Sequence, residues 1–135
     1  MFRRESLSGR APTIWRYREA LGIDGRTEAV SLGEGMTPLL GRRLDRQDVL
    51  LKVDYLCPTG SYKDRGASVM ITKVKEWCVP RIIEDSSGNA SASIAAYAAM
   101  AGIHADIYVP ATTSAGKAAQ ISMYGANLVK VPGTR

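Results

Sequence analysis

The chain has 135 residues, of which 45% are apolar and 23% are charged, a composition typical of a globular domain. Collagen-like, low-complexity and disordered chains are excluded because the glycines and prolines do not cluster, and the uncharged run 94–103 is far shorter than the roughly 20 residues of a membrane-spanning helix. The net charge of +5 comes mostly from five arginines in the first 18 residues. We expect these to form a solvated N-terminal arm that is neither a secretory signal nor a specific nucleic-acid binder.

The cysteines and the single histidine suggest no metal or redox site. Cys57 and Cys78 are too far apart for a redox pair and fit no zinc pattern. We expect both to be buried free thiols in a cytoplasmic protein. His104 begins a predicted strand, where we expect it at the surface.

The first sixty residues predict short elements. Residues 13–21 predict a short helix, with Thr13 as its cap and a glycine after its end. Residues 31–36 form a loop with two glycines, 49–53 read as a strand, and 57–60 form a turn.

A longer helix is predicted from Ser61 to about Trp77. Ser61 and Asp64 have the spacing of a capping box. Apolar residues recur at helical spacing and predict one buried face, made of Ala67, Met70, Ile71, Val74 and Trp77.

From residue 81 onward, strands and helices alternate. The strands are expected at 81–84, 105–109 and 128–131, with an alanine-rich helix at 90–101 and a second helix at 114–124. Such alternation requires parallel strands joined by right-handed crossovers. The predicted fold class is therefore α/β, an open and mainly parallel sheet flanked by helices.

Lys63 is the first candidate functional residue. It stands in the first turn of a helix, where the helix dipole and Arg65 lower the pKa of an amine and Asp64 opposes that shift. A lysine with a lowered pKa is the usual Schiff-base nucleophile. A surface lysine that happens to fall early in a helix is the alternative.

The loop 86–89, Ser-Ser-Gly-Asn, is the second candidate. It follows a strand and opens a helix, so its backbone amides and the helix dipole could bind an anion at the carboxyl end of the sheet. An ordinary strand-to-helix turn with a serine cap is the alternative.

Three segments in this order resemble the threonine synthases and, more broadly, the fold-type-II pyridoxal-phosphate (PLP) enzymes, which include tryptophan synthase beta. They are Ser-Leu-Gly-Glu-Gly-Met-Thr-Pro-Leu-Leu at 31–40, Pro-Thr-Gly-Ser-Tyr-Lys-Asp-Arg-Gly at 58–66 and Glu-Asp-Ser-Ser-Gly-Asn-Ala at 84–90. The resemblance runs from about residue 28 to the end. It implies that residues 1–60 start the large PLP-binding domain and that residues 61–135 form a small α/β domain.

The resemblance also implies roles for individual residues. Lys63 would be the Schiff-base lysine and the catalytic residue, and Asn89 would hydrogen-bond the ring hydroxyl oxygen of pyridoxal 5'-phosphate. Ser86, Ser87 and Gly88 would hold the substrate carboxylate. Tyr62 is a mild departure, because the family more often has phenylalanine there.

The implied reaction is that of a lyase, converting O-phosphohomoserine and water to threonine and phosphate. In this family the glycine-rich loop for the PLP phosphate lies well beyond the asparagine loop, whereas Gly116, Gly125 and Gly133 are isolated. We therefore expect this chain to be inactive alone. The alternatives are another fold-type-II lyase or dehydratase (cysteine synthase-like or serine/threonine dehydratase-like), a non-catalytic remnant, and a small anion-binding module. The implied partners are a small amino-acid substrate and either a second copy, as a homodimer, or a missing C-terminal half, with no membrane.

Overall fold

The computed structural model describes residues 4–133. Two short 3-10 helices come first, η1 (Arg4–Leu7) and η2 (Ile14–Ala20). The rest of the chain holds a hairpin, a further 3-10 helix, three α-helices and three more strands: β1 (Leu39–Leu44), β2 (Gln47–Lys52), η3 (Asp54–Leu56), α1 (Lys63–Glu76), β3 (Arg81–Glu84), α2 (Asn89–Ala101), β4 (His104–Pro110), α3 (Ala115–Met123) and β5 (Asn127–Val131). Among residues 4–133, no helix combines the length and hydropathy needed to cross a membrane.

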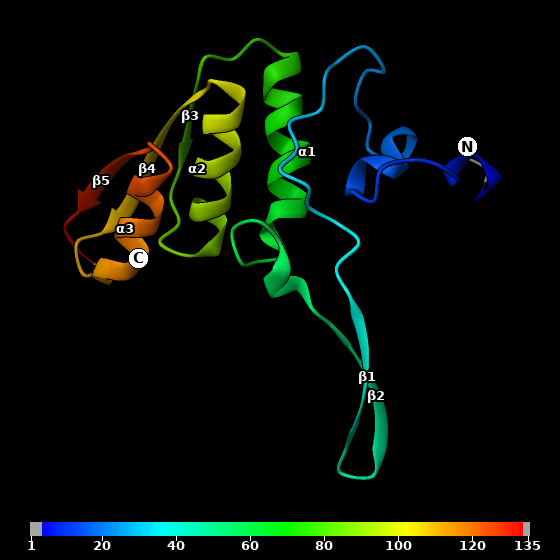
Figure 1. Cartoon of the computed structure of the whole chain (residues 1–135). Coiled ribbons are helices and arrows are strands. Elements are labelled where there is room, and N and C mark those ends of the chain that lie inside the picture. Colours follow the sequence, from blue (N-terminus) through cyan, green and yellow to red (C-terminus); the bar gives the residue numbers. More distant parts are fainter. Residues whose placement is uncertain (1–3, 134–135) are drawn as a thin grey trace.

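The predicted parallel sheet is confirmed. Its strands lie in the order β3-β4-β5, and both neighbouring pairs are parallel. Because α2 and α3 are the two crossovers between consecutive neighbours, right-handed connections bring both helices to the same face of the sheet. Helix α1 packs beside α2, and Figure 1 shows these two helices side by side.

The core lies between the sheet and its helices. Helix α2 is its centre, because it is apolar on almost every side and its middle residues are buried. Its alanines allow close approach to α1 and β4. The sheet contributes one face to this core, made of Ile82, Ala105, Ile107, Val109 and Leu128.

The opposite face of the sheet is not covered by any helix within residues 4–133. Ile83 is 70% exposed there, and Tyr108 and Val131 are partly exposed. Asp106 is buried on this face, because Arg81 and Asn127 on the neighbouring strands donate hydrogen bonds to its carboxylate at 2.5 Å and 2.8 Å. These bonds lower the pKa of Asp106. His104 is exposed, as expected.

The hairpin β1–β2 stands apart from the sheet. Its two strands are antiparallel, with Leu39 opposite Lys52, and Figure 1 shows it extending away from the helices. The sequence predicted only part of β2 and missed β1, because β1 is exposed along its whole length and carries no apolar alternation. On β2, Leu50 is likewise 69% exposed.

The N-terminal segment contacts α1 through Trp15, whose indole N–H donates to the Ser68 hydroxyl at 2.8 Å, while none of residues 5–29 is fully buried, as expected for a largely solvated arm. Arg10 binds both carboxylate oxygens of Glu19 at 2.7 Å, and Arg16 donates to the carbonyl of Leu7. Arg18 donates to the carbonyl of Asp24 at 2.7 Å. Arg3 lies outside the described residues. Thr13 caps η2 as predicted, although the helix is of the 3-10 type.

Several predicted details of α1 differ from the structure. The helix begins at Lys63, and its carboxylate at position 64 does not bond back to Ser61 as a capping box requires. Of the predicted apolar face, Ala67 and Ile71 are buried, whereas Trp77 is 64% exposed because it lies past the end of the helix. Cys57 is buried as predicted. Cys78 is exposed, with a left-handed backbone conformation at φ 56°.

Candidate functional site

The Lys63 backbone is fixed by a hydrogen bond, whereas its side-chain amine takes part in no salt bridge among the described residues. Ser61 is buried, and its hydroxyl accepts a hydrogen bond from the Lys63 backbone N–H at 3.1 Å. The turn before it is closed by a bond from the Gly60 N–H to the Cys57 carbonyl at 2.8 Å. The Lys63 side chain is exposed, and its Nζ lies 4.9 Å from the centre of the Tyr62 ring. It forms no salt bridge with any residue between 4 and 133.

Asp64, the next residue, points the opposite way. Its carboxylate is fully buried and accepts hydrogen bonds from the Thr59 N–H at 2.7 Å, the Thr59 hydroxyl at 2.5 Å and the Ser93 hydroxyl at 2.6 Å. Ser93 belongs to α2. Adjacent helical residues diverge in direction, so one turn of α1 presents an amine outward and a carboxylate inward.

The loop from Ser86 to Asn89 joins β3 to the start of α2. The Ser86 hydroxyl accepts from the Gly88 N–H at 3.2 Å, and the Ser91 hydroxyl donates to the Ser86 carbonyl. Gly88 is the N-cap and offers no capping side chain, and the first turn holds no acidic residue. The first backbone N–H groups of α2 therefore remain available as anion donors. The side chains of Ser87 and Asn89 form no hydrogen bond within residues 4–133.

The first turns of α1 and α2 meet at one groove. A groove of about 270 Å³ is lined by Lys63, Gly66, Ala67 and Met70 from α1 and by Ala90 and Ile94 from α2. Asn89 directly precedes Ala90. The structure thus brings the start of α1 and the start of α2 to the same opening.

The first motif, residues 31–40, contacts α1 and α2 but does not line this groove. Glu34 is fully buried and accepts hydrogen bonds from the Leu32 N–H at 2.9 Å and the Tyr97 hydroxyl at 2.7 Å. The Ser68 hydroxyl lies 2.6 Å from the same carboxylate. Burial first, and then the bond to Glu34, raises the pKa of Tyr97, so the hydroxyl remains a donor at any physiological pH. The motif therefore joins the N-terminal segment to α1 and α2.

The end of the same motif joins the hairpin to α1. Thr37 donates to Asp54 at 2.6 Å, and Arg65 pairs with Asp54 at 3.0 Å. The bond from Arg65, and then that from Thr37, lowers the pKa of Asp54. Burial raises the pKa of the neighbouring Cys57 thiol, which suits a structural cysteine better than a nucleophile.

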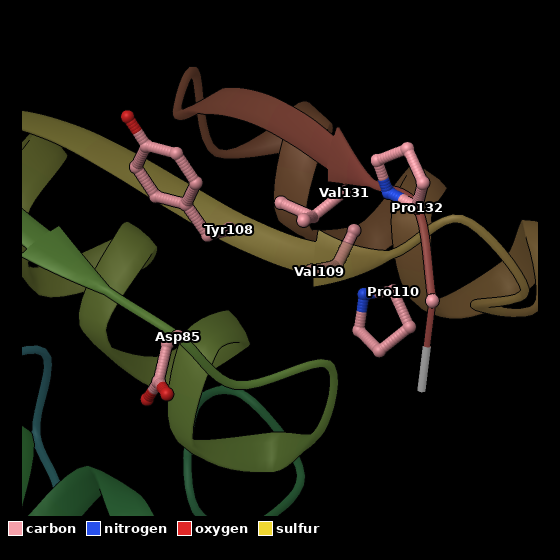
Figure 2. A pocket seen from close by; sticks show the side chains of 7 residues that line it. Asp85, Tyr108, Val109, Pro110, Val131 and Pro132 are labelled. Atoms are coloured by element: carbon pink, nitrogen blue, oxygen red, sulfur yellow. The ribbon is translucent and has the colours of Figure 1, made fainter. Parts of the chain in front are cut away.

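A second pocket, of about 180 Å³, lies at the carboxyl ends of β4 and β5. Figure 2 shows Pro110 and Pro132 at these strand ends, with Asp85 across the pocket on the segment that follows β3. Lys63 does not line it. Its walls are mostly apolar, so it supplies no second reactive centre.

The donor set of the α1–α2 groove suits pyridoxal phosphate, which is a flat aromatic aldehyde. Lys63 offers a primary amine, the walls are apolar, and the Asn89 amide is unengaged by residues 4–133. Within residues 4–133, no glycine-rich loop offers a ring of donors for the phosphate. Gly116 lies within α3, while Gly125 and Gly133 are in turns with positive φ.

Sequence reasoning missed the polar residues inside the core. Ser93 and Tyr97 lie one turn apart on α2, and each bonds a buried carboxylate from another segment. These two residues are four positions apart in a helix otherwise rich in alanine, and this spacing could have predicted a polar stripe on one helix face. Polar side chains on one face of a buried helix must find partners.

Comparison with known proteins identifies the family. A family model described as "Pyridoxal-phosphate dependent enzyme" matches residues 30–135. The chain is 38% identical to the threonine synthase of Methanocaldococcus jannaschii, over 96% of this chain and 33% of that protein. It is 41% identical to the threonine synthase of Mycobacterium leprae, over 89% of this chain and 35% of that protein. The chain thus spans about a third of the length of these relatives.

Solved structures agree with the fold. Maize serine racemase superposes with a TM-score of 0.67 at 27% identity, over 73% of this chain and 31% of that chain. O-ureido-L-serine synthase superposes with a TM-score of 0.66 at 28% identity, over 79% and 34%. With the family model covering most of its length, the chain belongs to the pyridoxal-phosphate-dependent enzymes, and its cofactor is pyridoxal 5'-phosphate.

Proposed function

We propose that this chain is the part of a threonine synthase-like lyase that carries the cofactor lysine, and that the reaction converts O-phosphohomoserine and water to threonine and phosphate. One observation carries the proposal. The curated relatives with 36–41% identity are threonine synthases, and the motifs shared with that family include Lys63 and Asn89, which lie at the openings of two adjacent helices.

Each residue has a role that its surroundings support. Lys63 would hold the cofactor through Nζ, which is exposed and has no competing ion pair in the described chain. The same amine would be the group that carries a proton. Bound pyridoxal phosphate supplies an electron sink. Asn89 donates to or accepts from the ring hydroxyl, because its amide has no other partner among residues 4–133.

The loop before α2 binds the substrate carboxylate. The hydroxyls of Ser86 and Ser87 and the backbone at Gly88 lie at an N-terminus without an acidic residue in its first turn. A carboxylate there is favoured by the helix dipole and by direct donors. The substrate is accordingly a small amino acid, and O-phosphohomoserine is the specific proposal.

Another reaction of the same family is the alternative. The solved neighbours at 27–28% identity include a serine racemase, an O-ureido-L-serine synthase and hydrogen sulfide-producing enzymes. They share the framework seen here, so the framework alone is compatible with elimination, replacement or racemisation. The division at residue 60 into two domains, the cytoplasmic location and the homodimer remain predictions of this proposal.

The test maps the cofactor bond and its response to substrates. The protein is mixed with pyridoxal phosphate, reduced with borohydride and digested, and adducts are located by mass spectrometry. We expect Lys63 to carry most of the label and Lys63→Gln to remove that label, while the exposed Lys117 serves as the reference site. Labelling spread evenly over the lysines would refute the role of Lys63.

Substrate choice is tested in the same system before reduction. O-phosphohomoserine should displace the cofactor from Lys63 at lower concentration than serine or O-acetylserine does. If serine displaces the cofactor best, a dehydratase or racemase replaces the threonine synthase proposal, and the cofactor lysine is retained.

A further inference from the structure

The buried carboxylate beside Lys63 has no cation to balance it among residues 4–133. Asp64 is fully buried and takes part in none of the ion pairs of that region. Burying an unpaired carboxylate is costly unless donors satisfy it. Here the donors are the N–H and hydroxyl of Thr59 and the hydroxyl of Ser93, together with the N-terminal end of α1 itself.

Thr59 is held on three of its polar atoms. Its N–H and hydroxyl both bond Asp64, and its carbonyl accepts from the Gln120 side chain of α3 at 3.3 Å. The turn that precedes Lys63 is therefore attached to α1 at one end and to α3 at the other. Free rotation of this turn would require breaking charge-assisted bonds, which are the stronger class.

Ser93 connects this turn to the second helix. It lies four residues after Asn89, so it occupies the same face of α2 one turn further along. Its hydroxyl donates to the Asp64 carboxylate at 2.6 Å. One carboxylate thus fixes the start of α1, which carries Lys63, against the start of α2, which carries Asn89.

We propose that Asp64 is a positioning residue: through Thr59 and Ser93 it sets where the Lys63 amine stands relative to the N-terminus of α2. This inference rests on the proposed function, in which both helix starts contact one cofactor. Asp64 touches neither cofactor nor substrate, because its side chain faces inward while Lys63 faces the groove.

The chain contains a matched control. Glu34 is also fully buried, and neutral donors that include the Tyr97 hydroxyl satisfy its carboxylate. It lies against Ser68 and Tyr97, each one turn beyond Asp64 and Ser93 along its own helix. Glu34→Gln therefore removes a similar buried charge from the same helix pair without touching the turn before Lys63.

The first measurement is geometric and needs no cofactor. Ala90 shares the groove with Lys63, so Ala90→Cys is joined to Lys63 by a short amine-to-thiol cross-linker. All variants in this experiment also carry Cys78→Ser, because Cys78 is an exposed thiol that would compete for the cross-linker. Cys57 is buried and is left in place. We expect Asp64→Asn to slow this cross-link at least fivefold and Glu34→Gln to change it less than twofold.

The second measurement is the share of borohydride-trapped pyridoxal phosphate found on Lys63. Asp64→Asn should lower that share at least fivefold against Lys117, and Glu34→Gln should not. Thr59→Val, which keeps the shape and removes the hydroxyl, should reproduce part of the loss, and Thr59→Ser should restore the wild-type share.

The outcomes separate the two claims. If Asp64→Asn and Glu34→Gln slow the cross-link equally, or if neither does, Asp64 is only structural and the inference is overturned. If the cross-link responds as expected but wild-type Lys63 takes up no preferential label, the positioning stands and the assignment of Lys63 as cofactor lysine fails.

Discussion

Arg65 Nη2 lies 3.0 Å from Asp54 Oδ1, and this ion pair joins the foot of the β1–β2 hairpin to the helix that begins at Lys63. Both side chains are about three-quarters buried, and Thr37 donates to the same carboxylate oxygen. The hairpin makes no pairing with the main sheet, so this contact orients it.

The Asp54–Arg65 pair predicts a pH-dependent part of the stability. Arg65 and Thr37 hold the pKa of Asp54 below its ordinary value of 3.8. A carboxyl with a lowered pKa contributes stability that is fully present above its ordinary value and is lost as the pH falls through the lower folded value. Asp54→Asn should therefore cost about 1 kcal/mol at pH 7, with a cost that shrinks in acid.

Urea unfolding of the wild type and Asp54→Asn at several pH values measures this difference. Asp48→Asn is the control, because Asp48 is an exposed carboxylate of the same hairpin without an ion pair in the described chain. A stability difference for Asp54→Asn that stays constant into strong acid would contradict the assignment.

Tyr97 gives a prediction about the core. Tyr97→Phe leaves the shape of the side chain unchanged and removes one donor from the buried Glu34 carboxylate. We expect a loss of about 1–3 kcal/mol in the free energy of unfolding. Tyr124→Phe should change it little, because that hydroxyl has no hydrogen bond within residues 4–133. Equal effects of the two substitutions would mean that the Glu34 network adds no stability.

Asn89 and Asn127 separate cofactor binding from stability. Asn89→Ala should weaken pyridoxal phosphate binding, since Asn89 directly precedes the groove residue Ala90 and its amide has no other partner among residues 4–133. Asn127→Ala should leave that binding unchanged while lowering stability, because Asn127 donates to Asp106 at 2.8 Å. Equilibrium titration with the cofactor, beside a thermal melt, measures both. Equal losses of affinity would remove Asn89 from the site.

The N-terminal arginines should not give specific nucleic-acid binding. Arg10, Arg16 and Arg18 are engaged with a carboxylate or with backbone carbonyls of the same segment. The remaining charge supports only weak contact that disappears as salt rises. Fluorescence anisotropy with a labelled duplex, at low and at physiological salt, tests this. Submicromolar affinity that survives the higher salt would be inconsistent with it.

The 135-residue chain by itself should turn over O-phosphohomoserine far more slowly than about 1 per second, which is within the range of ordinary enzymes. A phosphate with nearly two negative charges needs a ring of backbone donors, and residues after Asn89 supply none in the described part. Without that anchor the cofactor ring moves freely and proximity is lost. Phosphate release with added pyridoxal phosphate is the assay, and turnover at the usual enzymatic rate would place the anchor within this chain.

Local patterns predicted the second half of the fold well. The apolar pattern predicts the strands between residues 81 and 131, and glycines mark the ends of α2 and α3. Both signals depend only on residues that are close in sequence. The hairpin was predicted only in part, since Gly41, Arg42 and Arg43 interrupt any apolar alternation and the strand is exposed on both sides. Pattern reading depends on a buried face, and β1 has none.

The site was less accessible to pattern reading. The spacing of Ser61 and Asp64 indicated a local cap, but Thr59 and Ser93 bind the carboxylate instead, and Ser93 is distant in sequence. That Lys63 and Ala90 share one groove likewise depends on the packing of α1 against α2. Family motifs indicated that these segments belong together. Spacing alone could not distinguish Lys63 from a surface lysine, or the loop at 86–89 from an ordinary strand-to-helix turn.

The sequential strand order β3-β4-β5 has a consequence for how the chain folds. Each crossover joins strands that are already neighbours, so every pairing in this sheet closes a loop of modest length. Closing a shorter loop costs less conformational entropy, although parallel pairings across a crossover still form more slowly than local ones. The span from Arg81 to Val131 should therefore behave as one cooperative unit, whereas the hairpin, a lone pair of strands, should open and close independently of it.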